Sequence, residues 1–459
     1  MQDGLTLELG RFISGLRYAD IPSLALVPIR TAFVDTLGVA IAGAREPAVA
    51  LLHGMLSPPG GESLLLGGLG RASALDAAWI NGTAAHALDF DDVSQRGFGH
   101  ASASLVPAIL AEAQACGADG SRMLAAYAAG YETIAELTRR DADAGRYHDK
   151  GWHPTGPFGA IAAAAACASL RQLDARQCAM VLSLAGSQAS GLVANVGTMT
   201  KPFHVGRAAH AGVASARLVA AGFTAAIDAL EHPPGFLCAF SYGGRIDVSS
   251  PSTAGKDWQI CGANQISVKK YPTCFCTHRA IDGMLDLLAT HHIESAEVEA
   301  MELSLSRRNM VILRNQMPRN GLEAKFSAEF ALVAPLVARR LGLTELQDAF
   351  VQRPDVQSLM RRVRVVPDDR DHPQRPGYAV HDRIRITLRN GSVLDSGPIT
   401  GVRGDHDSPL RDGELQAKLE DCLRSCGSRV PPAQLYERLM QLDAMKDSAA
   451  LFRLLEEAP

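Results

Sequence analysis

The spacing of apolar and polar positions divides the chain into a long helical part and a shorter mixed part. Residues 21–43, 71–90 and 119–140 each carry apolar side chains at the spacing of one helix face. Their alanine-rich faces predict close helix–helix contacts within a large bundle. The uncharged residues 178–200 contain too many polar side chains for a lipid-facing helix and predict another buried bundle helix, as do residues 159–170. Residues 1–266 therefore predict the first part of an all-α domain.

The pattern changes near Lys269, where strand-like segments appear. Residues 296–306 alternate, residues 361–367 are short and β-branched, and residues 382–397 predict a hairpin turning at Asn390-Gly391. Helices are predicted at residues 277–291 and 322–341. Residues 267–403 thus predict a smaller α+β domain.

Beyond Gly404 the pattern is helical again, with Ser408-Pro409 as the predicted start of a helix. Residues 404–459 are expected to return to the helical domain. The predicted fold class is mainly α: a large all-α helical domain with an inserted smaller α+β domain.

Composition and charge narrow the functional classes. A length of 459 residues favours two domains, and a net charge of −4 provides no basic surface for nucleic acid or an anionic membrane. Nine scattered cysteines and an acidic N-terminal stretch without a basic segment predict a reduced, cytoplasmic protein without a signal peptide.

The segment from His86 to His100, "HALDFDDVSQRGFGH", is the first candidate for chemistry. On a helix, His86, Asp89 and Asp92 would share one face. The segment is compatible with a solvated helix end, a divalent-metal site or an acid–base site. No ligand pattern such as H-E-x-x-H occurs in the sequence, which argues against a metal.

Three further segments concentrate polar side chains. His153 and Thr155 stand where an alanine-rich helix begins, and free N–H groups there attract carboxylates, although His153 could equally be a packed or capping residue. Lys201 follows the uncharged stretch and either snorkels or holds an anion, with Arg207 two turns later.

The last segment, "SVKKYPTCFCTH", combines Lys269, Tyr271, Cys274, Cys276 and His278. The two cysteines lack the paired spacing of a zinc site or a C-x-x-C motif, so ordinary buried thiols are the simpler interpretation.

In their order along the chain, these segments resemble the 2-methylcitrate dehydratase (MmgE/PrpD) family. The family includes 2-methylcitrate dehydratases, cis-aconitate decarboxylases and iminodisuccinate epimerases. The resemblance implies a homodimer without cofactor or metal, with an all-α domain, a smaller α+β lid and an active site between the two. It rests on "HALDFDD", "GHASASLVPA", "GWHPTGPFGA", "TKPFHVGRAAHAG", "KKYPTCFCTHRAID", "EAKFSAEFAL" and "GDHDSPLRDGEL".

The resemblance also assigns candidate site residues. It places the site at Asp89, His100, His153, Lys201 and Lys269. Bond breaking next to a carboxylate needs cations, a base and an acid, so we expect Lys201 and Lys269 to hold substrate carboxylates, His153 to be the base, His100 the acid, and Asp89 to set histidine tautomers. Further substrate-binding candidates are Ser94, Arg207, Thr155 and Tyr271.

The chain departs from the family's cis-aconitate decarboxylases at three places. Val93-Ser94 stand in the region of a threonine, Cys274 replaces a histidine, and residues 313–325 lack a tyrosine. We therefore expect a dehydratase-type lyase acting on a small di- or tricarboxylate. The alternatives are an epimerase of the iminodisuccinate type, an inactive carboxylate-binding relative, and a metal-dependent hydrolase using the aspartates.

Overall fold

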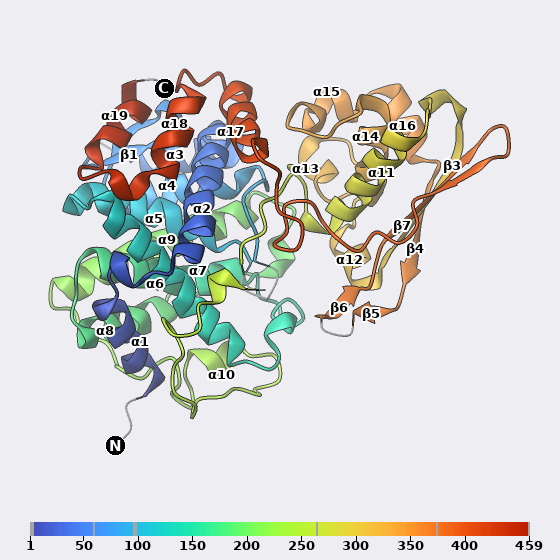
Figure 1. Cartoon of the computed structure of the whole chain (residues 1–459). Coiled ribbons are helices and arrows are strands. Elements are labelled where there is room, and N and C mark those ends of the chain that lie inside the picture. The colour runs from blue at the N-terminus through green and yellow to red at the C-terminus, as the bar shows by residue number, and fades with distance from the viewer. Residues whose placement is uncertain (1–3, 58–59, 95–98, 263–264, 373–374, 458–459) are drawn as a thin grey trace. The chain divides into compact units, whose positions relative to one another are not determined.

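The protein folds into two compact units. The structure, a computed structural model, describes residues 4–57, 60–94, 99–262, 265–372 and 375–457. The first unit comprises Met1–Ser267 and Arg411–Pro459, and the second comprises Val268–Leu410. The sequence placed these boundaries after residues 266 and 403. Helices dominate and the sheets are small (Figure 1), so the mainly α fold class is confirmed.

The first unit is a helical bundle with one small hairpin, β1 (Ser63–Leu65) and β2 (Gly70–Ala72). Apolar residues of its helices form one continuous core. Its helices are α1 (Leu5–Gly15), α2 (Ser23–Gly43), α3 (Pro47–Leu56), α4 (Ala74–Ala87), α5 (Ala101–Cys116), α6 (Gly120–Arg139), α7 (Thr155–Leu170), α8 (Ala175–Gly186), α9 (Thr200–Ala220), α10 (Phe236–Phe240), α17 (Glu414–Ser425), α18 (Pro432–Met440) and α19 (Ala449–Glu457).

Small residues let the central helices of this unit approach closely. Helix α9 packs on both α4 and α7. A Cβ added at Gly206 of α9 would clash with Thr83 of α4, and one added at Gly212 would clash with Ala163 of α7. Close-packed interiors do not absorb such added volume without strain. The two glycines therefore allow close packing of the helices at whose ends the candidate site residues lie.

Helix α2 is the one described helix whose length and composition would suit a membrane span, but most of it is buried in the bundle. Helix α17 packs on α2, so the end of the chain belongs to the first unit.

The second unit contains a four-stranded sheet in the order β4-β3-β7-β8. Strands β3 and β4 are parallel, and the other neighbours are antiparallel. Ile384 and Ile386 of β7 are fully buried, and α11 and α14 pack against this sheet and each other (Figure 1). Its elements are α11 (His278–Thr290), β3 (Val298–Ser306), α12 (Arg307–Ile312), α13 (Gly321–Ala324), α14 (Ala328–Ala338), α15 (Asp348–Val351), α16 (Pro354–Met360), β4 (Val363–Asp368), β5 (Asp371–His372), β6 (Arg375–Ala379), β7 (Arg383–Leu388) and β8 (Val393–Asp395).

Three helix predictions need correction. Residues 178–200 do not form one helix: α8 ends at Gly186, and Gly191 and Gly197 adopt positive φ angles of 134° and 89° before α9 begins. Residues 322–341 are split because Ser327 caps a new helix, α14. The helix predicted at Ser408 begins only at Glu414, as α17.

Candidate active site

The turn after α4 decides how the first candidate segment is arranged. The helix ends at Ala87, so the prediction that His86, Asp89 and Asp92 share a helix face is wrong. Asp89 adopts a left-handed conformation with φ of 53°, which aspartate tolerates better than most residues. Because of this reversal, neighbouring carboxylates of the segment contact different partners.

Asp91 joins two histidines. One of its carboxylate oxygens lies 2.8 Å from Nδ1 of His86 and 3.0 Å from Nδ1 of His100. The Nδ1 atom of His100 also lies 2.8 Å from the carbonyl oxygen of Asp92, which can only accept a hydrogen bond. Nδ1 of His100 therefore carries a hydrogen. Asp91, which the sequence did not single out, therefore orients both imidazoles, and the expected part of Asp89 in setting their tautomers stays a prediction.

The same contacts decide the charges. Burial would raise the pKa of Asp91, but the imidazole N–H donors hold that pKa well below its usual range. Burial, together with Lys201 and His100, lowers the pKa of His86 to about 3. Asp91 is therefore an anion and His86 a neutral ring that donates from Nδ1. Nε2 of His86 has no hydrogen-bond partner among the described residues.

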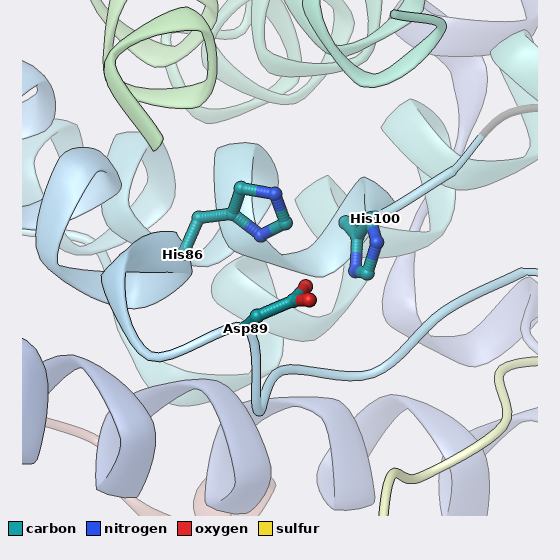
Figure 2. Close-up of side chains that lie close together, drawn as sticks. All are labelled: His86, Asp89 and His100. Carbon is teal, nitrogen blue, oxygen red and sulfur yellow. The ribbon is translucent and has the colours of Figure 1, made fainter. Parts of the chain in front are cut away.

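Lys201 is bound by Asp89. Its Nζ lies 2.6 Å from Oδ1 of Asp89, and both side chains are almost fully buried. Lys201 is the second residue of α9, where the helix dipole disfavours a positive charge. Asp89 offsets this cost. Figure 2 shows the Asp89 carboxylate pointing toward the gap between the rings of His86 and His100.

His153 continues the row of imidazoles. It precedes α7, and its ring is stacked 5.9 Å from that of His86. Its Nδ1 lies 3.3 Å from Nδ1 of His204, one turn beyond Lys201 on α9. Burial, Lys201 and the neighbouring imidazoles hold the pKa of His153 well below its usual range, so the ring is neutral. His204 was not among the residues expected from the sequence, although its position three residues after Lys201 on one helix was a signal for it.

Thr155 and Ser94 lie close to His100 in the chain or in space. The Oγ1 of Thr155 accepts a hydrogen bond from the backbone N–H of His100 at 3.2 Å. Ser94 is buried, and its backbone N–H donates to the carbonyl of Gly99 at 2.8 Å. Both contacts position His100; whether either residue also binds substrate stays a prediction.

Arg207 contacts other side chains. Its guanidinium lies 4.5 Å above the ring of Trp79, and its Nη1 lies 3.1 Å from Nδ1 of His210. Burial lowers the pKa of Arg207. The structure thus brings Asp89, His100, His153 and Lys201 into one cluster, whereas the contacts of Arg207 are with Trp79 and His210.

The remaining predicted residues belong to the second unit. Lys269 is fully buried there. The hydroxyl of Tyr271 donates to Asp282 at 2.7 Å, and burial together with Asp282 raises the pKa of Tyr271. The backbone N–H of Cys274 donates to the carbonyl of Lys325. Tyr271 and Cys274 are therefore tied into their own unit.

One part of the cluster has the composition of a metal site. Ligand atoms of His86, Asp89 and His100 lie within 4.8 Å of one another, and imidazole and carboxylate suit several divalent ions. The positively charged ammonium of Lys201, however, already lies against the carboxylate of Asp89. A metal ion bound to the same carboxylate would be repelled by that charge.

Fold and site together describe a helical protein with a buried carboxylate–histidine–lysine centre. The chain belongs to the MmgE/PrpD family: residues 7–249 match the MmgE/PrpD N-terminal domain and residues 271–441 the C-terminal domain.

Similar proteins include cis-aconitate decarboxylases. The human protein is 24% identical over 99% of this chain and 95% of its own length. The Mus musculus protein is 25% identical over 83% and 78%. The protein from Aspergillus terreus (strain NIH 2624 / FGSC A1156) is 24% identical over 99% and 96%.

Proposed function

We propose that this protein is a cofactor-independent lyase that acts on a small di- or tricarboxylate through proton transfer at the carbon next to a carboxylate. The observation that carries the proposal is the neutral ring of His153 in the same buried cluster as the Lys201 ammonium. A neutral imidazole can accept a proton, and a fixed ammonium stabilises the negative charge left on the substrate.

Each member of the cluster has a distinct part in this reaction. His153 removes the proton, and Lys201 binds the carboxylate on which negative charge accumulates. His100, with hydrogens on both ring nitrogens, donates the one on Nε2 to the departing hydroxyl group, which leaves as water, while its Nδ1–H stays held by Asp91. The ring of His86 contacts both, at 4.4 Å from the ring of His100 and 5.9 Å from that of His153.

Elimination of water is the reaction type we propose. The relatives named as cis-aconitate decarboxylases support a lyase. Cys274 and the absence of a tyrosine in residues 313–325 favour dehydration over decarboxylation. Epimerisation is the second candidate, because the same neutral base would begin it and reprotonation on the other face would complete it.

The test is proton exchange in D₂O. Purified protein is incubated with citrate, 2-methylcitrate, cis-aconitate and malate, and ¹H NMR follows deuterium uptake and product formation. An alkene or hydrated product identifies dehydration or its reverse, exchange with inversion identifies epimerisation, and release of CO₂ identifies decarboxylation. His153→Asn should abolish the signal, while His53→Asn on α3 serves as the matched control. Absence of any exchange with the wild-type protein contradicts the proposal.

A metal-free homodimer in the cytoplasm remains our expectation. Elemental analysis and a chelator test address the metal, and light scattering coupled to size exclusion addresses the dimer. Stoichiometric metal with chelator-sensitive turnover would make Asp89 a metal ligand instead of the partner of Lys201.

A further inference from the structure

We propose that His204 is the proton partner of His153: the two rings share one hydrogen between their Nδ1 atoms, and His204 receives the proton that His153 takes from the substrate. The inference deepens the proposed function and rests on it for the identity of the proton donor. The pairing itself rests on geometry alone.

The contact between the rings restricts their tautomers. The two Nδ1 atoms are 3.3 Å apart, and a hydrogen bond at this contact needs one donor and one acceptor. A neutral imidazole carries its single hydrogen on either Nδ1 or Nε2. The two neutral rings must therefore be opposite tautomers. With its hydrogen on Nδ1, His153 presents the lone pair of Nε2 as the base, and His204 carries its own hydrogen on Nε2.

The surrounding backbone holds the pair together. The N–H of His153 donates to the carbonyl of Gly191 at 3.0 Å. A Cβ added at Gly191 would lie 3.3 Å from the ring of His204, and the residue has a φ of 134°, which side chains rarely adopt. Gly191 therefore lies against both histidines, and a side chain at this position would crowd the ring of His204.

The charges around the pair give the transfer its direction. The Lys201 ammonium, bound to Asp89, lies one turn before His204 on α9, and His86 with its partner Asp91 lies on the α4 side of His153. Burial and Lys201 lower the pKa of His153 strongly, whereas burial alone lowers that of His204. His204 is also the more exposed of the two, at 8% against 3%. An extra proton is therefore more stable on His204.

The proton balance is as follows. The C–H bond of the substrate breaks, its electron pair stays on carbon, and the proton bonds to Nε2 of His153. The hydrogen on Nδ1 of His153 then moves to Nδ1 of His204. His204 becomes the cation, and His153 is neutral again with its hydrogen on Nε2. The reverse steps return a proton to the carbon.

Nitrogen-15 NMR on selectively labelled histidines tests the pairing without any substrate. We expect His153 to carry its hydrogen on Nδ1 and His204 on Nε2, as read from long-range proton–nitrogen couplings. His153→Asn and His204→Asn assign the signals, and each should change the other ring's shifts, while His53→Asn should change neither. The same tautomer on both rings would overturn the proposal.

Exchange kinetics test the relay. The amide of His204→Asn can replace the Nδ1 contact but cannot take up a proton. We expect the exchange rate with the responsive acid to fall about tenfold to a hundredfold at unchanged KM, with the melting temperature preserved. Wild-type exchange in this variant would overturn the relay. If the wild-type protein catalyses no deuterium exchange into any of the acids, the proposed function fails. The histidine spectra then still test the hydrogen bond between His153 and His204 by themselves.

Discussion

Asp91 and Asp92 are consecutive, fully buried carboxylates, yet their surroundings shift their pKa values in opposite directions. Asp91 accepts hydrogen bonds from two imidazoles, which hold its pKa well below the usual range against the effect of burial. Burial and the nearby carboxylate of Asp35 raise the pKa of Asp92 well above it. The comparison shows that burial alone does not decide the charge of a carboxylate; its partners do.

The two carboxylates also connect to different parts of the first unit. Asp91 orients the site histidines, whereas Asp92 belongs to a cluster with Asp35 and Lys418. The Nζ of Lys418 lies 2.5 Å from Oδ1 of Asp35 and 2.6 Å from the carbonyl of Phe90. Helix α17 near the C-terminus therefore fixes the backbone between Asp89 and Asp91.

Lys418→Met should give the largest effect. It leaves Asp35 buried without its cation and removes the donor to Phe90, which typically costs about 3–5 kcal/mol in the free energy of unfolding. Urea unfolding measures the change. Lys418→Met combined with Asp35→Asn should recover part of the loss, and an unchanged unfolding midpoint in the single variant would show that the cluster does not stabilise the fold.

Lys201→Met extends the comparison to Asp89, the third carboxylate of the segment, whose partner is an ammonium group. Loss of one fixed cation that stabilises developing charge should lower kcat by roughly a hundred- to a thousandfold, about 3–4 kcal/mol. Because Asp89 also loses its partner, the melting temperature is measured in parallel. Adding Asp89→Asn should restore the melting temperature without restoring turnover. Turnover near the wild-type rate would remove Lys201 from the mechanism.

Asp91→Asn tests the orientation of the imidazoles. An amide cannot accept both Nδ1–H bonds as an anion does, so His86 and His100 should lose their fixed tautomers. We expect kcat/KM to fall at least about ten- to a hundredfold, the loss found when a carboxylate that fixes a histidine tautomer at a metal site is replaced. Histidine nitrogen shifts should change together with the rate; a rate loss without such changes would contradict the tautomer explanation.

Asp92→Asn should have the smallest effect. At pH 5 it should change the free energy of unfolding by no more than about 1 kcal/mol, because the native carboxyl is protonated and resembles the amide. Its effect should depend on pH. Above about pH 4 an unfolded aspartate loses its proton while native Asp92 retains it, so wild-type stability falls with rising pH by up to about 1.4 kcal/mol per unit from this group.

An asparagine at this position cannot ionise. Asp92→Asn should therefore lose less stability than the wild type as the pH rises from 5 toward the raised pKa of native Asp92, as measured by urea unfolding at a series of pH values. Parallel pH dependences for the two proteins would show that Asp92 is ionised in the native state.

Local sequence patterns were sufficient to predict many of the helices and strands. The alternation of Ile384, Ile386 and Leu388 predicted strand β7, because a strand with one buried face repeats every two residues. The apolar spacing of residues 119–140 likewise predicted α6 (Gly120–Arg139) closely. Motif resemblance singled out Asp89, His100, His153 and Lys201, which the structure brings into one cluster.

The partners within the cluster required the tertiary structure. Helical spacing continued through Asp89, but α4 ends at Ala87, so that Asp89 meets Lys201 and Asp91 meets the imidazoles. The pairing of His153 with His204 depends on how α7 and α9 pack, which no local pattern encodes. Sequence periodicity records which residues are buried, whereas pKa values and hydrogen bonds depend on distances of a few ångströms between distant segments, which only packing determines.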